Sequence, residues 1–141
     1  MTNRNLALIV KDQNPLILAA SQTVQHACQR MWERRVGAVL VTDEKHHHLA
    51  GIFTGRDAVR ILAECKDPVA TTLADAMTSN PDTITPQSTT IDALREMSDG
   101  GYRHLPVVEH GKILGIVSRG DFKGLELDRL EDETHLWECI G

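Results

Sequence analysis

Hydrophobic and polar residues follow three successive patterns in the first half of the chain. Residues 16–19, "LILA", form a short apolar run that indicates an extended segment. Apolar residues then recur at spacings of three and four, which predicts an amphipathic helix. Its apolar stripe consists of Val24, Ala27, Cys28, Met31 and Trp32. Residues 36–43, "VGAVLVTD", and 49–54, "LAGIFT", predict two strands with a tight connection, and residues 57–65, "DAVRILAEC", return to helical spacing.

The second half repeats this order of segments. An extended run at 82–85, "DTIT", precedes a helix whose stripe contains Thr90, Ala93, Leu94 and Met97. Thr89 followed by Asp92 resembles a capping box, and Gly100-Gly101 suits a left-handed helix end. Strands are predicted at 103–109 and 113–118, where Pro106 indicates an edge strand or the start of a strand. A helix is predicted from Asp121 to the C-terminus.

Individual residues match between the two halves. Asn14-Pro15 recurs as Asn80-Pro81, and "GIFTGRD" (51–57) recurs as "GIVSRGD" (115–121). Each half therefore has the order β-α-β-β-α, and the fold class is α+β with two tandem repeats. We assign residues 5–66 to the first repeat and residues 67–141 to the second, with a helical C-terminal tail and a short helix at 72–77, "TLADAM", in the connection. One repeat alone would bury little surface, so we expect the two to pack around a pseudo-twofold axis.

The repeated turn permits two interpretations. In the first interpretation, the turn only caps the following helix. Thr54 would then be the N-cap residue with Asp57 as the third residue of the helix, and Ser118 and Asp121 would have the same roles in the second copy. As a binding site, the helix start would offer N–H groups to a phosphate, and the carboxylate would accept both hydroxyls of a ribose. Arg56 and Arg119 lie inside the two turns and could contact the anion. The two interpretations are compatible.

Taken together, these motifs resemble the cystathionine-β-synthase (CBS) domain. The resemblance covers about residues 5 to 127 and rests on the Asn-Pro pair, the Ala-Met helix, the "PVV" strand and the Gly-apolar-apolar-Thr/Ser-x-x-Asp turn, all present twice or nearly so. The first copy departs from the pattern, because it has Leu40 where the second copy has Pro106 and lacks a methionine before Asn14. The departures weaken the expectation of a first pocket more than that of the fold.

The resemblance implies that the turns bind the ribose and phosphate of AMP, ADP, ATP, NAD or S-adenosylmethionine in the cleft between the repeats. By the same resemblance, Ile17 and Ala38 in the first copy, and Thr83, Tyr102 and His104 in the second, would contact the adenine. Plain core packing is the alternative for Ile17 and Ala38. We predict the second repeat to be the better site, since it matches the family more fully.

Composition and charge limit the other classes of function. The net charge of −5 and the lack of a long basic cluster argue against nucleic-acid binding, and no apolar run is long enough to span a membrane. Three scattered cysteines and no secretion signal indicate a cytoplasmic protein. His46, His47 and His48 suggest a metal site, but we interpret them as a solvated loop without a second ligand cluster. "RGD" at 119–121 is interpreted as chance.

These observations predict a non-enzymatic regulatory module that binds an adenosyl ligand, has no obligatory cofactor and signals to a separate effector protein. A structural or dimerisation module with an empty cleft is the alternative. An enzyme is a third hypothesis, although no set of nucleophile, base and orienting residue can be read from the sequence. We also predict a homodimer, because the two apolar-striped helices exceed what one module can bury, with Trp32 at the interface.

Overall fold

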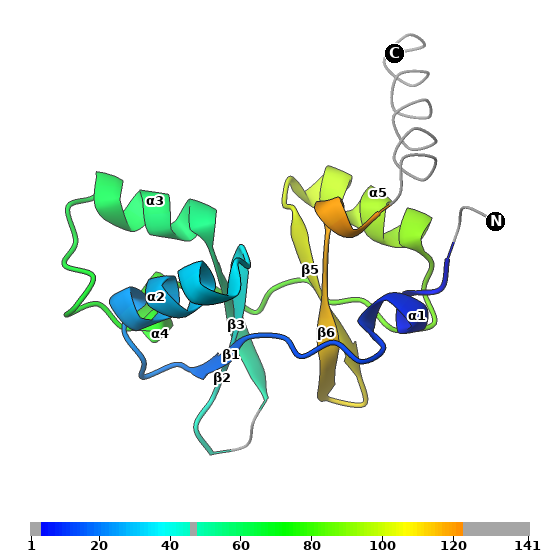
Figure 1. The fold of residues 1–141 in the computed structure, drawn as a ribbon, viewed down its shortest axis with the longest axis horizontal. Coiled ribbons are helices and arrows are strands. Elements are labelled where there is room, and N and C mark those ends of the chain that lie inside the picture. Colours follow the sequence, from blue (N-terminus) through cyan, green and yellow to red (C-terminus); the bar gives the residue numbers. More distant parts are fainter. Residues whose placement is uncertain (1–3, 46–47, 123–141) are drawn as a thin grey trace, which may run out of the picture. The chain divides into compact units, whose positions relative to one another are not determined.

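The computed structural model describes residues 4–45 and 48–122 and confirms the α+β class. The chain forms two compact units (Figure 1). Of the described residues, the first unit contains those of Asn14–Asp82 and Gly111–Ile113, and the second contains residues 4–13, Thr83–His110 and residues 114–122.

A four-stranded sheet forms the centre of the first unit. Its order is β1 (Ile17–Ala19), β2 (Ala38–Thr42), β3 (Leu49–Thr54) and β4 (Thr78–Ser79). β1 runs parallel to β2, whereas the β2–β3 and β3–β4 pairs are antiparallel. The apolar run before the first helix and the two predicted strands of the first repeat are therefore confirmed.

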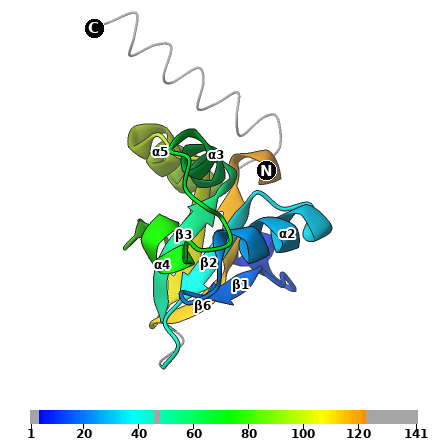
Figure 2. The ribbon, with the colours of Figure 1, turned by 90° about the vertical axis from the view of Figure 1, so that its left-hand side faces the viewer.

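Three helices belong to the same unit: α2 (Val24–Arg34), α3 (Gly55–Ala63) and α4 (Leu73–Ala76). Figure 1 shows α2 and α3 on one side of the sheet, and Figure 2 views the unit from that side. The apolar stripe of α2 divides into two parts. Val24, Ala27 and Met31 are buried and Cys28 is half-buried against the core, whereas Trp32 is 80% exposed. Burial raises the pKa of the Cys28 thiol.

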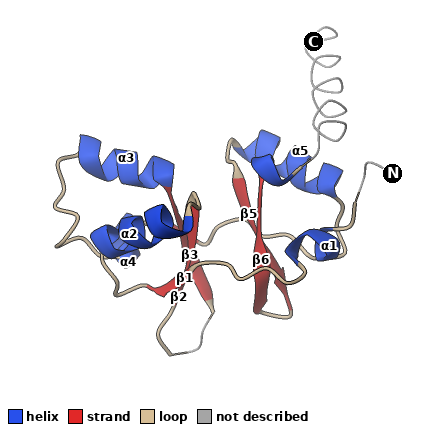
Figure 3. Cartoon of the chain, viewed as in Figure 1, coloured by secondary structure: helices blue, strands red, loops and turns tan. Residues whose placement is uncertain are grey.

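The second unit contains α1 (Leu6–Val10), α5 (Thr90–Gly100), β5 (His104–Glu109), β6 (Lys112–Ser118) and a single 3₁₀ turn at Arg119–Asp121 (Figure 3). The predicted stripe of α5 is buried throughout, Thr89 and Asp92 form the predicted capping box, and Gly101 ends the helix with φ 74°. β5 and β6 form a two-stranded sheet, so Pro106 lies on an edge strand as predicted. The predicted run at 82–85 contributes one parallel bridge, from Ile84 to Val107.

The first glycine of each repeated turn motif permits a close backbone approach. A Cβ atom at Gly51 would lie 2.7 Å from the carbonyl oxygen of Thr78 and 2.8 Å from Cγ of Met77. A Cβ atom at Gly115 would lie 2.9 Å from Cβ of Val10. Each glycine is therefore packed against the segment that precedes the Asn-Pro pair of the other copy.

The two copies pair this segment with the sheet in different ways. In the first unit, the backbone of β4 pairs with Gly51 and Ile52. In the second unit, the side-chain amide of Gln13 performs this pairing: its Nε2 donates to the carbonyl of Ile116 at 2.9 Å and its Oε1 accepts from the Ile116 amide at 2.6 Å. One side chain thus replaces a short strand at the edge of β6.

The compact units combine segments that are distant in sequence. Residues 4–13, which we call the N-terminal segment, belong to the second unit, whereas the connection at 67–82 belongs to the first. The repeat boundaries 5–66 and 67–141 stay a prediction about the organisation of the sequence. The prediction that the C-terminal helix begins at Asp121 is wrong, because Asp121 ends the 3₁₀ turn and Phe122 has an extended backbone. The rest of that predicted helix falls at 123–141, outside the described residues.

Candidate functional site

The first turn follows β3 and opens α3. Ala38 pairs directly with Thr54, and the Gly55 amide donates to the carbonyl of Gly37 at 3.1 Å. The amide of Thr54 donates to Oδ2 of Asp57 at 2.9 Å, and the amide of Asp57 donates to Oγ1 of Thr54 at 3.4 Å. The predicted capping box is confirmed, and it fixes the Asp57 carboxylate at the end of the β2–β3 hairpin.

One arginine side chain lies near the Asp57 carboxylate. Nη2 of Arg60 lies 3.9 Å from Oδ1 of Asp57, whose side chain is 15% exposed. Arg60 also donates to the carbonyl of Ala76 at 2.6 Å, which ties α3 to the end of α4. Arg56 is exposed. Both oxygens of Asp57 therefore already have neighbours, one in the cap and one near a cation.

The second turn repeats the main hydrogen bonds of the first, although it opens a single 3₁₀ turn where the first opens the helix α3. The Arg119 amide donates to the carbonyl of Arg103 at 3.0 Å, which is the counterpart of the bond from Gly55 to Gly37. Both the amide and the hydroxyl of Ser118 donate to Oδ2 of Asp121, at 2.7 and 3.2 Å. Asp121 is exposed, and both of these bonds are made to Oδ2. The second carboxylate is thus the more available acceptor.

His104 opens β5 beside this turn and is half-buried. Burial lowers the pKa of its imidazole, and the neighbouring Arg103 charge lowers it further, while the Asp121 carboxylate acts in the opposite direction. The imidazole is therefore neutral near pH 7 and offers one donor and one acceptor nitrogen.

The other predicted residues lie at these same sheet ends or next to them. Ile17 is 42% exposed on β1, so it is not a plain core residue, whereas Ala38 is 7% exposed within the sheet. Thr83 is exposed and precedes the Ile84 bridge, and Tyr102 is half-buried against the core of the second unit. In the first unit, Ala38 lies beside the turn that contains Thr54, Arg56 and Asp57. In the second unit, His104 lies beside the turn that contains Ser118, Arg119 and Asp121, whereas Tyr102 packs against the core.

Three polar residues near the turns were not predicted from sequence. Arg60 lies one helical turn after Asp57, a spacing that sequence inspection could have used. Arg4 donates from Nη2 to the carbonyl of Asp121 at 3.2 Å, and the side-chain amide of Gln13 forms hydrogen bonds with both backbone groups of Ile116. Arg4 and Gln13 are each more than a hundred residues from their partner in sequence, so no local pattern indicates these contacts.

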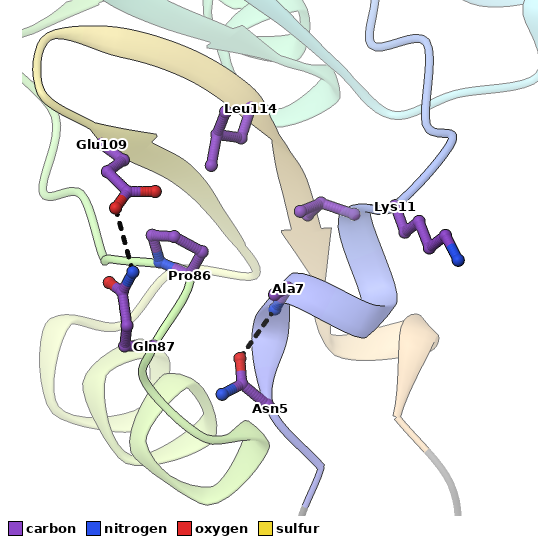
Figure 4. A pocket seen from close by; sticks show the side chains of 8 residues that line it. Asn5, Ala7, Lys11, Pro86, Gln87, Glu109 and Leu114 are labelled. Atoms are coloured by element: carbon purple, nitrogen blue, oxygen red, sulfur yellow. Dashed lines mark hydrogen bonds between the residues drawn. The ribbon is translucent and has the colours of Figure 1, made fainter.

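A pocket of about 350 Å³ lies elsewhere on the second unit, beside α1 (Figure 4). One wall is closed by a hydrogen bond from Nε2 of Gln87 to Oε1 of Glu109 at 3.0 Å. Its lining residues are Asn5, Ala7, Val10, Lys11, Pro86, Gln87, Glu109 and Leu114. None of the predicted ligand-binding residues lines it.

In the part of the chain that the structure describes, no three His, Cys, Asp or Glu side chains gather in a way that could hold a metal ion. His46 and His47 fall outside the described residues. Within residues 4–45 and 48–122, no helix has the length and apolarity needed to cross a membrane.

The chain matches a known protein family once in each of its two repeats. The family model of the CBS domain matches residues 9–64 and 73–127. The CBS domain-containing protein CBSCBSPB2 of Arabidopsis thaliana is 44% identical over 103 residues, which cover 72% of this chain and 19% of that protein. The chain thus spans about a fifth of that relative's length. The protein YlbB of Bacillus subtilis is 35% identical over 98 residues, covering 70% of this chain and 66% of YlbB.

Solved structures share the fold. A signal-transduction protein with CBS domains from Burkholderia ambifaria has a TM-score of 0.76 and 30% identity, and the match covers 84% of this chain and 90% of that one. The CBS domain protein PAE2072 of Pyrobaculum aerophilum, complexed with AMP, has a TM-score of 0.82 and 22% identity, with 92% and 99% of the two chains covered.

Proposed function

Because the chain belongs to the CBS domain family and contains two CBS repeats, we propose that it is a regulatory module that binds an adenosine-containing ligand. The observation that carries this proposal is the duplicated turn, in which each aspartate is held in place by its own cap at the end of a hairpin. Such preorganisation lowers the cost of ordering the carboxylate when a ligand binds.

The second turn is proposed as the principal site. Asp121 is exposed and accepts its cap bonds on one carboxylate oxygen, whereas Asp57 is mostly covered and has Arg60 beside its second oxygen. His104 and Arg119 add a neutral imidazole and a cation next to Asp121. This group suits a ribose diol with an adjoining phosphate.

AMP is the first ligand to test, since PAE2072, which has the same fold, is complexed with AMP. A thermal-shift screen with AMP, ADP, ATP, NAD and S-adenosylmethionine tests the proposal. A ligand that binds only the folded chain raises the melting temperature by mass action. No shift at millimolar concentration with all five would refute the ligand-binding role. A hydrolysis assay on the same nucleotides tests our proposal that the chain is not an enzyme.

Association of two chains is a second proposed role, and it is compatible with the first. Trp32 on α2 is 80% exposed, and Val59 and Leu62 on α3 are 64% and 71% exposed. Large exposed apolar side chains on two neighbouring helices are typical of an interface. We therefore propose a homodimer formed through these helices. If no ligand binds, a dimerisation module is the function that this surface supports.

A further inference from the structure

The N-terminal segment (residues 4–13) is attached to the second unit by contacts with residues far along the chain (Figure 1). Leu6 and Val10 are buried in the core of that unit. The amide of Leu6 donates to the carbonyl of Ser88 at 2.9 Å, and the amide of Ala7 donates to that of Pro86 at 3.0 Å.

Both ends of this segment contact the second turn or the strand that leads into it. At one end, Nη2 of Arg4 donates to the backbone carbonyl of Asp121 at 3.2 Å. At the other end, Gln13 pairs with both backbone groups of Ile116, two residues before Ser118. The position of the turn therefore depends on where the segment lies.

An open pocket adjoins the attachment between these ends. The pocket of about 350 Å³ is lined by Ala7, Val10 and Lys11 of the segment and by Pro86, Gln87 and Leu114 (Figure 4). The helix α1 has only five residues, so it is not stable without its contacts with the second unit, and a short terminal element held in this way opens at a lower free energy than the core does. The N-terminal segment can therefore detach from the second unit without global unfolding.

We propose that docking of the N-terminal segment and occupancy of the Ser118–Asp121 turn by an adenosine nucleotide are coupled, so that the segment carries the binding signal out of the second unit. This inference rests on the proposed function. Coupling is reciprocal: if the nucleotide binds only when the segment is docked, bound nucleotide must hold the segment in place to the same degree.

Amide hydrogen exchange of the full chain, with and without AMP, tests the coupling. The amides of Leu6, Ala7 and Ile116 report on the segment, because each donates across its attachment. The amide of Leu94, inside α5, reports on global unfolding. We expect the three reporter amides to exchange faster than that of Leu94. AMP at ten times its Kd should slow them about 10-fold.

Two variants and a matched control complete the test. Gln13→Ala should speed exchange at Leu6 and Ala7 about 5- to 150-fold, because two hydrogen bonds are lost. Gln29→Ala, the same change at an exposed position of α2, should leave it unaltered. Arg4→Ala should reduce the AMP-induced slowing, since the direct bond to the turn is gone.

Three outcomes overturn the proposal. Exchange of the reporter amides no faster than that of Leu94, even in Gln13→Ala, would mean that the segment does not open by itself. Unchanged reporter exchange while calorimetry records AMP binding would refute the coupling alone. Failure of the wild-type chain to bind AMP in calorimetry would refute the AMP site, and the coupling with it.

Discussion

Replacing Asp121 with asparagine separates ligand binding from helix capping at the second turn. Oδ2 of Asp121 accepts from the Ser118 amide at 2.7 Å and from its hydroxyl at 3.2 Å. Asparagine retains one acceptor oxygen, so it can preserve the cap. Its NH₂ group stands where a ribose hydroxyl would need the second acceptor. The free chain should therefore lose only a few tenths to about 1 kcal/mol of stability.

The loss of AMP affinity should be larger. A hydrogen bond to a charged group contributes about 1.5–3 kcal/mol, which corresponds to about 10- to 150-fold in Kd. Isothermal titration calorimetry of the wild type and of Asp121→Asn measures this change directly. Melting curves of the two free proteins measure the capping contribution.

Asp92→Asn is the matched control, because Asp92 has the same role in a capping box without being a proposed ligand residue. Its Oδ2 accepts from the Thr89 amide at 3.0 Å. This variant should lose similar stability but bind AMP like the wild type. Asp57→Asn should weaken binding less than Asp121→Asn, since Arg60 already lies near its second oxygen. If Asp121→Asn binds AMP within about twofold of the wild type, the ribose role is wrong and the turn is only a cap.

Three further predictions concern stability and assembly. Gly115→Ala should destabilise the chain by about 1–3 kcal/mol in chemical unfolding, because its Cβ would overlap Val10, whereas Gly55→Ala, with open space around it, should cost nothing. Equal effects of the two would refute the close-approach argument. Analytical ultracentrifugation should find twice the 15.6 kDa mass for the wild type and a monomer for Trp32→Glu; a wild-type monomer at micromolar concentration contradicts the dimer. The lowered pKa of His104 means that the unfolded chain binds the proton first, so the unfolding free energy should fall as the pH drops below about 6.5, and His104→Gln should flatten that dependence. If the unfolding free energy of the variant depends on pH as in the wild type, that dependence comes from groups other than His104.

Local chemistry made much of the fold predictable. The strand at Leu49–Thr54 and the capping boxes at Thr54 and Thr89 were predicted correctly, because each depends on residues within a few positions of one another. The helix α1 was not predicted, since a segment of five residues is too short to be stable alone and depends on its bonds to Pro86 and Ser88.

The site residues could likewise be predicted from the sequence only where a local or repeated pattern indicates them. The sequence indicated Thr54, Asp57, Ser118 and Asp121 by repetition, and the structure places each pair in a turn at the end of a hairpin. Helical spacing alone did not distinguish Met31 from Trp32, because the sheet covers only part of the apolar arc of α2. The contacts of Arg4 are set by tertiary structure.

The placement of the N-terminal segment has a consequence for biosynthesis. Gln13 and Ile116 are 103 residues apart, and Arg4 and Asp121 are 117 apart. Most of the first unit is continuous from Asn14 to Asp82, so it can begin to assemble while the ribosome is still translating the rest. Leu6 and Val10 are synthesised early, yet their core partners are the last part of the described chain to be made. Closing such long loops is slow, so this step should limit the rate at which newly made protein acquires its second unit.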